Sequence, residues 1–371
     1  MKRTLLVTLD FHPNVGGVAS YWRSLSNHLP REQWIVLAPS LPRGWKELEA
    51  AYPIFRRNLL VSWLLPRWLP IMFHAAMIAR AERISHIVVG QILPVGTAIR
   101  ILSAVLRIPY TVSTHGMDVT LPLRSYRKRS LARWILRGAQ SVITISEYTA
   151  HILEQNGVGR ERIRFVRPCP VITPALYRDS DQNLHLRTAR HILLTVGRLV
   201  QRKGVTDVIR ALPDLLKEFP DLIYGIIGEG PELHSIQLAI DELSLNHRVY
   251  LLGELDNEKI AWWYRHCTLF IMTPKEINGD VEGFGIVYLE AGSFGKPVIG
   301  SRSGGVLDAV LDGETGVLVP PANSHAIAGA IRTLLHGDAA RTKLGEQGRA
   351  RVEKDFQWKV QAEKLKRYLS D

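Results

Sequence analysis

The stretch Glu282-Gly283-Phe284-Gly285-Ile286-Val287-Tyr288-Leu289-Glu290 contains two glutamates with seven residues between them. Its glycines predict a loop, and the apolar residues that follow predict the start of a helix. The backbone N–H groups at such a helix N-terminus form a ready site for an anion. Two carboxylates around an anion site suit a ligand with phosphates in the middle and hydroxyl groups at both ends. A sugar nucleotide has that shape.

Outward from this stretch, short unbroken runs of Val, Ile and Leu alternate with helical patterns. Such runs are typical of parallel strands that are buried on both faces. In the first half the predicted strands are Thr4–Leu9, Trp34–Ala38, His86–Gly90, Tyr110–Ser113 and Ser141–Ile145. In the second half they are His191–Val196, Leu222–Ile227, Val249–Leu252, Leu269–Met272, Pro297–Gly300 and Gly316–Val319. Repeated βα units predict an α/β fold of doubly wound, Rossmann-like architecture.

A proline-rich and then polar segment, between Arg167 and Arg190, separates the two series of strands. Such a composition is typical of a linker between domains. We predict an N-terminal domain at 1–170, a linker at 171–189, a C-terminal domain at 190–353 and a terminal helix at 354–371. Ligands of such sheets bind at the carboxyl ends of the strands. We therefore expect two facing domains with the site in a deep cleft between them.

The basic charge is concentrated in the first half of the 371-residue chain. Residues 1–180 carry 24 Lys/Arg and 10 Asp/Glu, whereas residues 181–371 carry 23 and 25. No segment reaches the ~20 apolar residues of a membrane-spanning helix. The two cysteines, Cys169 and Cys267, are too few for a disulfide framework and suit a reducing cytosol. We therefore expect a cytoplasmic protein.

Two basic segments, residues 56–68 and 124–137, interleave arginines with Trp and Leu. This mixture favours contact with an anionic lipid surface over a nucleic-acid groove. No helix-turn-helix, zinc-finger or RNA-recognition pattern accompanies it, so we predict no nucleic-acid partner. We expect peripheral contact with the inner face of the cell membrane, and a solvated basic face over an ordinary core is the alternative.

Several predicted strands end in residues that suit a sugar or a phosphate. Gly16 and Gly17 follow the first strand, and His115 opens the polar quartet 115–118 after another. In the second half, Gly197 is followed by Arg198 and Lys203, two cations that suit a diphosphate. The turn after Ile227 contains Gly228 but lacks the third glycine of a dinucleotide fingerprint. Each of these motifs is also compatible with an ordinary tight turn or a surface charge.

The segment Asp179-Ser180-Asp181 has the Asp-x-Asp form of a metal site. It lies in the polar linker rather than at the end of a strand, so we predict a surface segment. No other segment has metal-ligand spacing, and no motif indicates a protein nucleophile. We predict no metal and no cofactor.

In their order and spacing, Gly16-Gly17, Arg198, Lys203 and Glu282–Glu290 resemble the retaining glycosyltransferases of family 4, also termed glycosyltransferase group 1. These enzymes have the GT-B fold, and the resemblance covers nearly the whole chain. Three further segments resemble the family: Gly304-Gly305, Gly313–Pro320 and Phe356–Tyr368, the last of which packs back on the first domain in such proteins.

The resemblance implies a role for each matching residue. The implied catalytic residues are His115, Arg198, Lys203 and Glu282, with the two cations on the donor diphosphate and Glu282 beside the donor sugar. The implied donor-binding residues are Gly16, Gly17, Gly197, Gly228, Gly253, Phe284, Gly285, Ile286 and Glu290, with Glu290 on the ribose.

The resemblance also implies a reaction. A hexose would pass from a nucleotide sugar to a hydroxyl group with retention of configuration, and the leaving phosphate would act as the base. A transient nucleophilic role of Glu282 is the rival mechanism. Residues 277–285 look most like the bacterial mannosyltransferases, which favours GDP-mannose over a UDP-sugar. The acceptor would be a lipid-linked sugar or a glycan of envelope or exopolysaccharide synthesis. A phosphorylase, a nucleotide-sugar epimerase and a non-catalytic binding protein are the alternatives.

Overall fold

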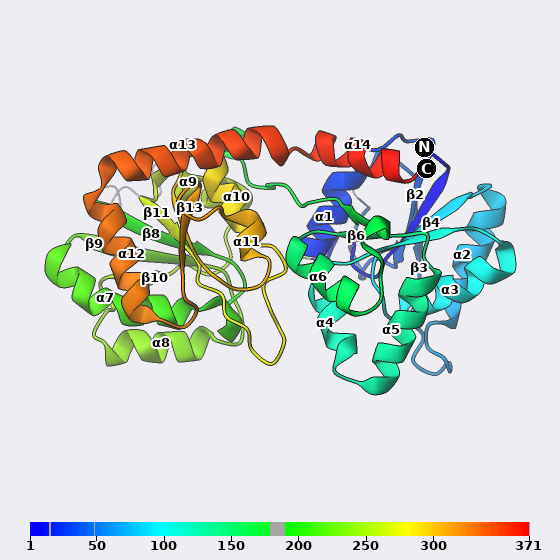
Figure 1. The fold of residues 1–371 in the computed structure, drawn as a ribbon, viewed down its shortest axis with the longest axis horizontal. Coiled ribbons are helices and arrows are strands. Elements are labelled where there is room, and N and C mark those ends of the chain that lie inside the picture. Colours follow the sequence, from blue (N-terminus) through cyan, green and yellow to red (C-terminus); the bar gives the residue numbers. More distant parts are fainter. Residues whose placement is uncertain (15, 48, 179–189, 371) are drawn as a thin grey trace. The chain divides into compact units, whose positions relative to one another are not determined.

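The computed structural model describes residues 1–14, 16–47, 49–178 and 190–370 (Figure 1). Its contacts divide the chain into two compact units. Unit 1 consists of Met1–Pro168 together with Trp358–Asp371, and unit 2 is Cys169–Gln357. Each unit contains one parallel sheet with helices packed on it, as the sequence predicts.

The sheet of unit 1 has seven parallel strands in the order β3-β2-β1-β4-β5-β6-β7. The strands are β1 Thr4–Val7, β2 Trp34–Pro39, β3 Ile54–Arg57, β4 His86–Val89, β5 Tyr110–Ser113, β6 Ser141–Thr144 and β7 Ile163–Phe165. The helices are α1 Gly17–Ser26, α2 Leu69–Ala81, α3 Val95–Leu106, α4 Met117–Leu123, α5 Tyr126–Gly138, α6 Glu147–Gln155 and α14 Trp358–Tyr368.

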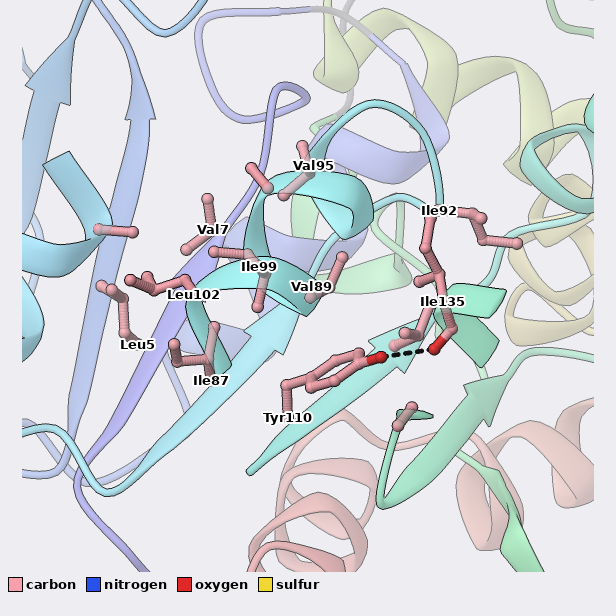
Figure 2. Close-up of a cluster of buried hydrophobic side chains, with 14 of the residues drawn as sticks. Leu5, Val7, Ile87, Val89, Ile92, Val95, Ile99, Leu102, Tyr110 and Ile135 are labelled. Atoms are coloured by element: carbon pink, nitrogen blue, oxygen red, sulfur yellow. Dashed lines mark hydrogen bonds between the residues drawn. The ribbon is translucent and has the colours of Figure 1, made fainter. Parts of the chain in front are cut away.

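The core of unit 1 fills the space between one face of this sheet and helices α2, α3 and α5. Alternate strand residues such as Leu5 and Val7 point to this face, as the two-residue period of a strand requires. They pack against Ile99 and Leu102 of α3 (Figure 2). The buried hydroxyl of Tyr110 donates to the carbonyl of Ile135 in α5, so the one polar atom of this ring has a partner.

Helix α14 ends the chain as part of unit 1. It packs on α1, where the rings of Tyr21 and Trp358 lie 5.9 Å apart. The side chain of Gln361 accepts a hydrogen bond from the Arg167 amide at 2.9 Å. These contacts attach the last helix to the start of the chain and to the end of β7.

The sheet of unit 2 has six parallel strands in the order β10-β9-β8-β11-β12-β13. The strands are β8 His191–Val196, β9 Leu222–Ile227, β10 Val249–Leu251, β11 Leu269–Ile271, β12 Val298–Ser301 and β13 Gly316–Val319. The helices are α7 Val205–Glu218, α8 Leu233–Glu242, α9 Asn257–His266, α10 Ile286–Ser293, α11 Val306–Ala309, α12 Ser324–His336 and α13 Asp338–Asp355. Single turns of 3-10 helix lie at Arg160–Arg162, Pro174–Leu176 and Gln201–Lys203.

All eleven predicted strands are present, with ends that differ by no more than two residues. The strands that the sequence did not predict are β3 and β7, the two edges of the first sheet. Their sequences, Ile-Phe-Arg-Arg and Ile-Arg-Phe, are half-exposed and interrupted by arginine. These two edge strands therefore lack the unbroken apolar run on which the prediction relied, whereas the edge strands β10 and β13 of the second sheet are apolar and were predicted.

Residues 171–178 of the predicted linker belong to unit 2, because the amides of Val171 and Ile172 bond within it. Both cysteines are buried. Among the described residues, no helix is long and apolar enough to cross a membrane.

Candidate functional site

Glycines follow three neighbouring strands of unit 2 at the same edge of its sheet. Gly197 follows β8 and Gly228 follows β9, while Gly253 comes two residues after β10. The Gly228 amide donates to the Gly253 carbonyl at 2.8 Å. Gly228 has φ +129°, and a Cβ there would overlap the Gly197 carbonyl oxygen. The structure therefore brings these three predicted residues together, with the backbones in direct contact.

The segment between β11 and α10 turns into its helix as the sequence predicts. Gly285 precedes the first helical residue, Ile286, and has φ +93°. A Cβ at Gly285 would come within 2.6 Å of the Tyr288 ring, so both space and conformation require glycine here. Among the described residues, the amides of Phe284, Gly285 and Ile286 donate no hydrogen bond. They are available to a ligand at the start of α10.

Glu282 is buried and carries an ion pair to each of two cations. Its Oε2 accepts from Lys203 Nζ at 2.6 Å and from Arg202 Nη1 at 2.6 Å. The Lys203 ammonium also lies beside Gly197, 3.9 Å from where a Cβ on that glycine would stand. Lys203, Glu282 and Gly197 therefore form one cluster at the carboxyl edge of the sheet.

Asp280 extends this cluster, because its Oδ1 lies 3.1 Å from Arg202 Nε. Burial alone would raise the pKa of the Glu282 carboxyl, but Lys203 and Arg202 outweigh burial and hold that pKa below its ordinary 4.5. Glu282 is thus an ionised carboxylate at neutral pH and is unsuited to act as a proton donor.

Glu290 lies eight residues further along and has a different set of partners. Its Oε1 accepts from the amides of Val171 and Ile172 at 3.2 and 3.1 Å. Its Oε2 accepts from the Tyr264 hydroxyl at 3.0 Å. Burial raises the pKa of Glu290 and exceeds the opposing effect of these three hydrogen bonds. Oε2 keeps acceptor capacity beyond the Tyr264 bond, which a hydroxyl of a ligand could use.

Arg198 follows Gly197 and points its side chain to solvent. Within the described part of the chain, its guanidinium has no hydrogen bond or ion pair. An exposed guanidinium at the carboxyl end of a strand can bind a phosphate without first breaking a protein contact. Arg198 and Lys203 thus flank Gly197: among the described residues the Arg198 side chain has no partner, whereas Lys203 is paired with Glu282.

The predicted residues of unit 1 lie at the carboxyl edge of its own sheet. His115 follows β5, its Nε2 lies 3.1 Å from the Ser113 hydroxyl, and its ring packs edge-on against Tyr21 and Trp22 of α1. Burial lowers the pKa of His115 to about 4, so the imidazole is neutral at pH 7. Gly16 and Gly17 are exposed at the start of α1, the same helix.

Two charged residues of these clusters, Arg202 and Asp280, were absent from the predicted site. Arg202 is adjacent to Lys203 in the sequence, and Asp280 stands two residues before Glu282. Their closeness to predicted residues was the available signal. Asp118 accepts from the His115 amide at 2.7 Å, and burial raises its pKa to about 7. Its Oδ2 is buried without a partner among the described residues. Asp118 is the fourth residue of the predicted quartet 115–118.

The predicted surface segment Asp179-Ser180-Asp181 lies outside the described residues. Within residues 1–14, 16–47, 49–178 and 190–370, no group of three or more His, Cys, Asp or Glu is arranged to hold a metal ion. The expectation of a reaction without metal or cofactor stays a prediction.

The model of the family described as Glycosyltransferase Family 4 matches residues 15–169, and that of Glycosyl transferases group 1 matches residues 178–351. The chain is a family 4-like glycosyltransferase with the GT-B fold. The resemblance, the fold class and the enzyme class predicted from the sequence are confirmed. As a glycosyltransferase of this type, it uses a nucleotide-sugar donor.

The glycosyltransferase matches curated relatives over their full length. A GDP-mannose-dependent alpha-(1-6)-phosphatidylinositol monomannoside mannosyltransferase from Mycolicibacterium smegmatis is 29% identical over 99% of this chain and 98% of its own. A GDP-mannose-dependent monoacylated alpha-(1-6)-phosphatidylinositol monomannoside mannosyltransferase from Corynebacterium glutamicum is 28% identical over the same shares.

Solved structures confirm the fold of the glycosyltransferase. Anabaena Alr3699/HepE in complex with UDP has a TM-score of 0.82 at 20% identity and covers 100% of both chains. Sucrose-phosphate synthase from Thermosynechococcus elongatus has a TM-score of 0.79 at 22% identity, with 100% of this chain and 98% of its own covered.

Proposed function

We propose that the protein transfers mannose from GDP-mannose to a lipid-linked sugar acceptor with retention of configuration and without a metal ion. The observation that carries the proposal is the Lys203–Glu282–Arg202 cluster beside Gly197 and the start of α10. It supplies cations, free amides and an ionised carboxylate within one edge of the sheet. The GDP-mannose-dependent mannosyltransferases among the relatives support the donor and the lipid acceptor.

The donor diphosphate would lie between Lys203, Arg198 and the amides of residues 284–286. Fixed positive charge there neutralises the charge that grows on the phosphate as the bond to the sugar breaks. Glu282 already neutralises part of the Lys203 charge. The Lys203 ammonium would therefore turn from the Glu282 carboxylate toward the diphosphate when the donor enters. Arg202 remains to hold Glu282, since it is also fixed by Asp280.

Glu282 would then accept hydrogen bonds from hydroxyl groups of the mannose. Its lowered pKa keeps it ionised, which suits an acceptor of hydrogen bonds and a stabiliser of developing positive charge on the sugar. The leaving phosphate would take the proton of the acceptor hydroxyl, on the same face of the sugar. Glu290 would hold the ribose through the free acceptor capacity of Oε2.

His115 would contribute as a neutral imidazole. With its pKa near 4, it accepts or donates a hydrogen bond at pH 7 but carries no charge that would compete for the diphosphate. Its Nε2 contacts Ser113, which leaves Nδ1 for a hydroxyl of the sugar. Gly16, at the exposed start of α1, would allow close approach of the donor or acceptor.

A thermal-shift panel of sugar nucleotides, followed by an assay of transfer to a mannosylated lipid, tests the proposal. GDP and GDP-mannose are expected to raise the melting temperature more than UDP and UDP-sugars. Proton NMR of the product reports whether the anomeric configuration is retained. A larger shift with a UDP-sugar would overturn the proposed donor, and consumption of donor without an acceptor would favour an epimerase.

A further inference from the structure

An apolar groove lies between helices α2 and α3 of unit 1, and His115 is not among the residues that line it. Its cavity volume is about 600 Å³, within the ~300–1,000 Å³ of typical ligand clefts. Leu69, Phe73 and Ala76 of α2 line one wall, and Val105 and Leu106 of α3 line the other. The two helices pack against each other along the sheet (Figure 1).

The rim of this groove exposes large apolar side chains to solvent. Phe73 is 60% exposed and Val105 71%. In the loop before α2, Trp63 is 83% exposed and Leu65 86%, on either side of the groove residue Leu64. Soluble proteins rarely leave so much contiguous apolar surface open, so this face indicates a partner that removes it from water.

The surroundings of the groove carry positive charge. Arg80 lines the groove itself, and Arg57, Arg67 and Arg107 are exposed at the ends of the neighbouring elements. Residues 56–137 contain 13 Lys/Arg and only two Asp/Glu. Of those two carboxyls, Glu82 is paired with Arg3 and Asp118 is buried with a raised pKa. The face therefore combines an apolar centre with a basic margin.

Helix α5 continues the basic surface. The Arg100 guanidinium of α3 lies 5.3 Å from the ring centroid of Trp134 in α5, which joins the two helices at the surface. Near the start of α5, the consecutive residues Arg127, Lys128 and Arg129 are all exposed. Arginines beside Trp and Leu are typical of proteins that lie in the interface of an anionic bilayer.

We propose that the α2–α3 groove binds an acyl chain of an anionic membrane glycerolipid, with the surrounding arginines on lipid head groups. The apolar lining fits the chain, and the basic margin fits the phosphate charge. A second copy of this protein would bring arginine against arginine, which opposes a symmetric dimer through this face. This binding is independent of the donor site and of the acceptor sugar.

Vesicle binding tests the charge. The full-length protein is expected to co-float with vesicles of phosphatidylglycerol mixed about one to two with phosphatidylcholine, and not with phosphatidylcholine alone. The triple variant R57Q/R67Q/R80Q is expected to bind about a hundredfold more weakly, since each basic residue near an anionic surface contributes about fivefold. R210Q/K343Q/K354Q removes the same charge from exposed positions of unit 2 and is the matched control.

Cross-linking tests the groove. A phosphatidylglycerol with a diazirine in its acyl chain is expected to label residues 64–106, and Ala76→Trp is expected to cut that labelling at least tenfold by filling the groove. Ala104→Trp, exposed on α3 outside the lining, is the control. If the Ala76→Trp variant does not fold, the double variant Phe73→Ser/Val105→Ser replaces it. This variant removes an apolar side chain from each wall of the groove and is expected to reduce the labelling.

Three results would overturn the proposal. The first is equal binding of both triple variants to the anionic vesicles, and the second is lipid cross-linking spread outside residues 64–106. The third is a dimer in solution that the substitution Ala76→Trp dissociates. A thermal shift with GDP-mannose, measured on the same preparations, reports the donor site separately. Failure of lipid binding with an intact donor shift would refute this inference alone.

Discussion

Glu282 and Glu290 stand at the two ends of one nine-residue segment, and both are buried, yet their surroundings differ. Glu282, in the loop, faces two cations, and its pKa is lowered. Glu290, inside α10, faces two amides and a hydroxyl, and its pKa is raised. Burial acts on both carboxyls alike, so the charge of the partners decides which one stays firmly ionised. One motif thus contains one carboxylate placed for charge and another placed for hydrogen bonding.

Removing the cation beside Glu282 is expected to have the largest effect. Lys203→Ala should lower kcat by about 10³-fold, because a fixed charge at the leaving phosphate disappears. The melting temperature should change little, since Arg202 still pairs with Glu282. Lys217→Ala, which removes an exposed lysine paired with Asp214, is the control and should leave transfer unchanged. Full activity of the Lys203→Ala variant would show that the Lys203–Glu282–Arg202 cluster has no role in the mechanism.

Neutralising Glu282 is expected to be nearly as severe. Glu282→Gln keeps the shape of the side chain but removes its charge, and transfer should fall by about 10²-fold or more. The substitution leaves the positive charges of Lys203 and Arg202 without the negative charge of Glu282, and these cations still attract the donor diphosphate. The affinity for the donor, measured by calorimetry, should therefore fall by a smaller factor than kcat. A normal kcat with a raised KM would instead make Glu282 a simple binding residue.

Glu290 is expected to matter more for stability than for the chemical step. Glu290→Ala leaves the Val171 and Ile172 amides and the Tyr264 hydroxyl without their acceptor, at about 1 kcal/mol each. Denaturant unfolding should therefore report a loss of about 3 kcal/mol. Glu290→Gln retains a carbonyl for the two amides and should lose no more than about 1 kcal/mol. Equal losses in both variants would contradict the contacts described for Glu290.

The pH dependence of stability should separate the two carboxyls. Glu282 has a lowered pKa, so its contribution is present above pH 4.5 and is lost as the pH falls through its folded-state pKa. Glu290 has a raised pKa, so its contribution is complete below pH 4.5 and is lost as the pH rises through its folded-state pKa. Unfolding free energies of each Glu→Gln variant against the unsubstituted protein should therefore diverge in opposite directions. Parallel curves would show that the two environments do not differ.

The smallest expected effect is that of Tyr264→Phe. This change removes one hydrogen bond to Glu290 Oε2 and should lower the free energy of unfolding by about 1 kcal/mol. Because that bond opposes the effect of burial, its loss should raise the pKa of Glu290 further. Carboxyl NMR of Glu290 measures the shift, and an unchanged or lowered pKa would contradict it.

The sequence predicted the central strands well because a strand buried on both faces leaves an unbroken apolar run. The edge strands β3 and β7 have no such run, because they are partly exposed and arginines interrupt their apolar residues. For the site, glycines at strand ends identified the right edge of the sheet. Arg202 and Glu282 are 80 positions apart in the sequence, and Val171 and Glu290 are 119 apart. Folding alone brings the members of each pair together. No local pattern contains such pairings.

The position of helix α14 in the sequence affects the order in which the two units can fold during synthesis. Unit 1 is discontinuous in sequence, because Trp358–Asp371 complete a body that begins at Met1, whereas unit 2 is one continuous segment. On a ribosome, unit 2 can finish folding while the face of α1 that receives α14 is still uncovered. That face becomes covered only after residues 358–368 have left the exit tunnel. A nascent chain halted shortly before Trp358 would thus hold a complete second unit and an unfinished first one.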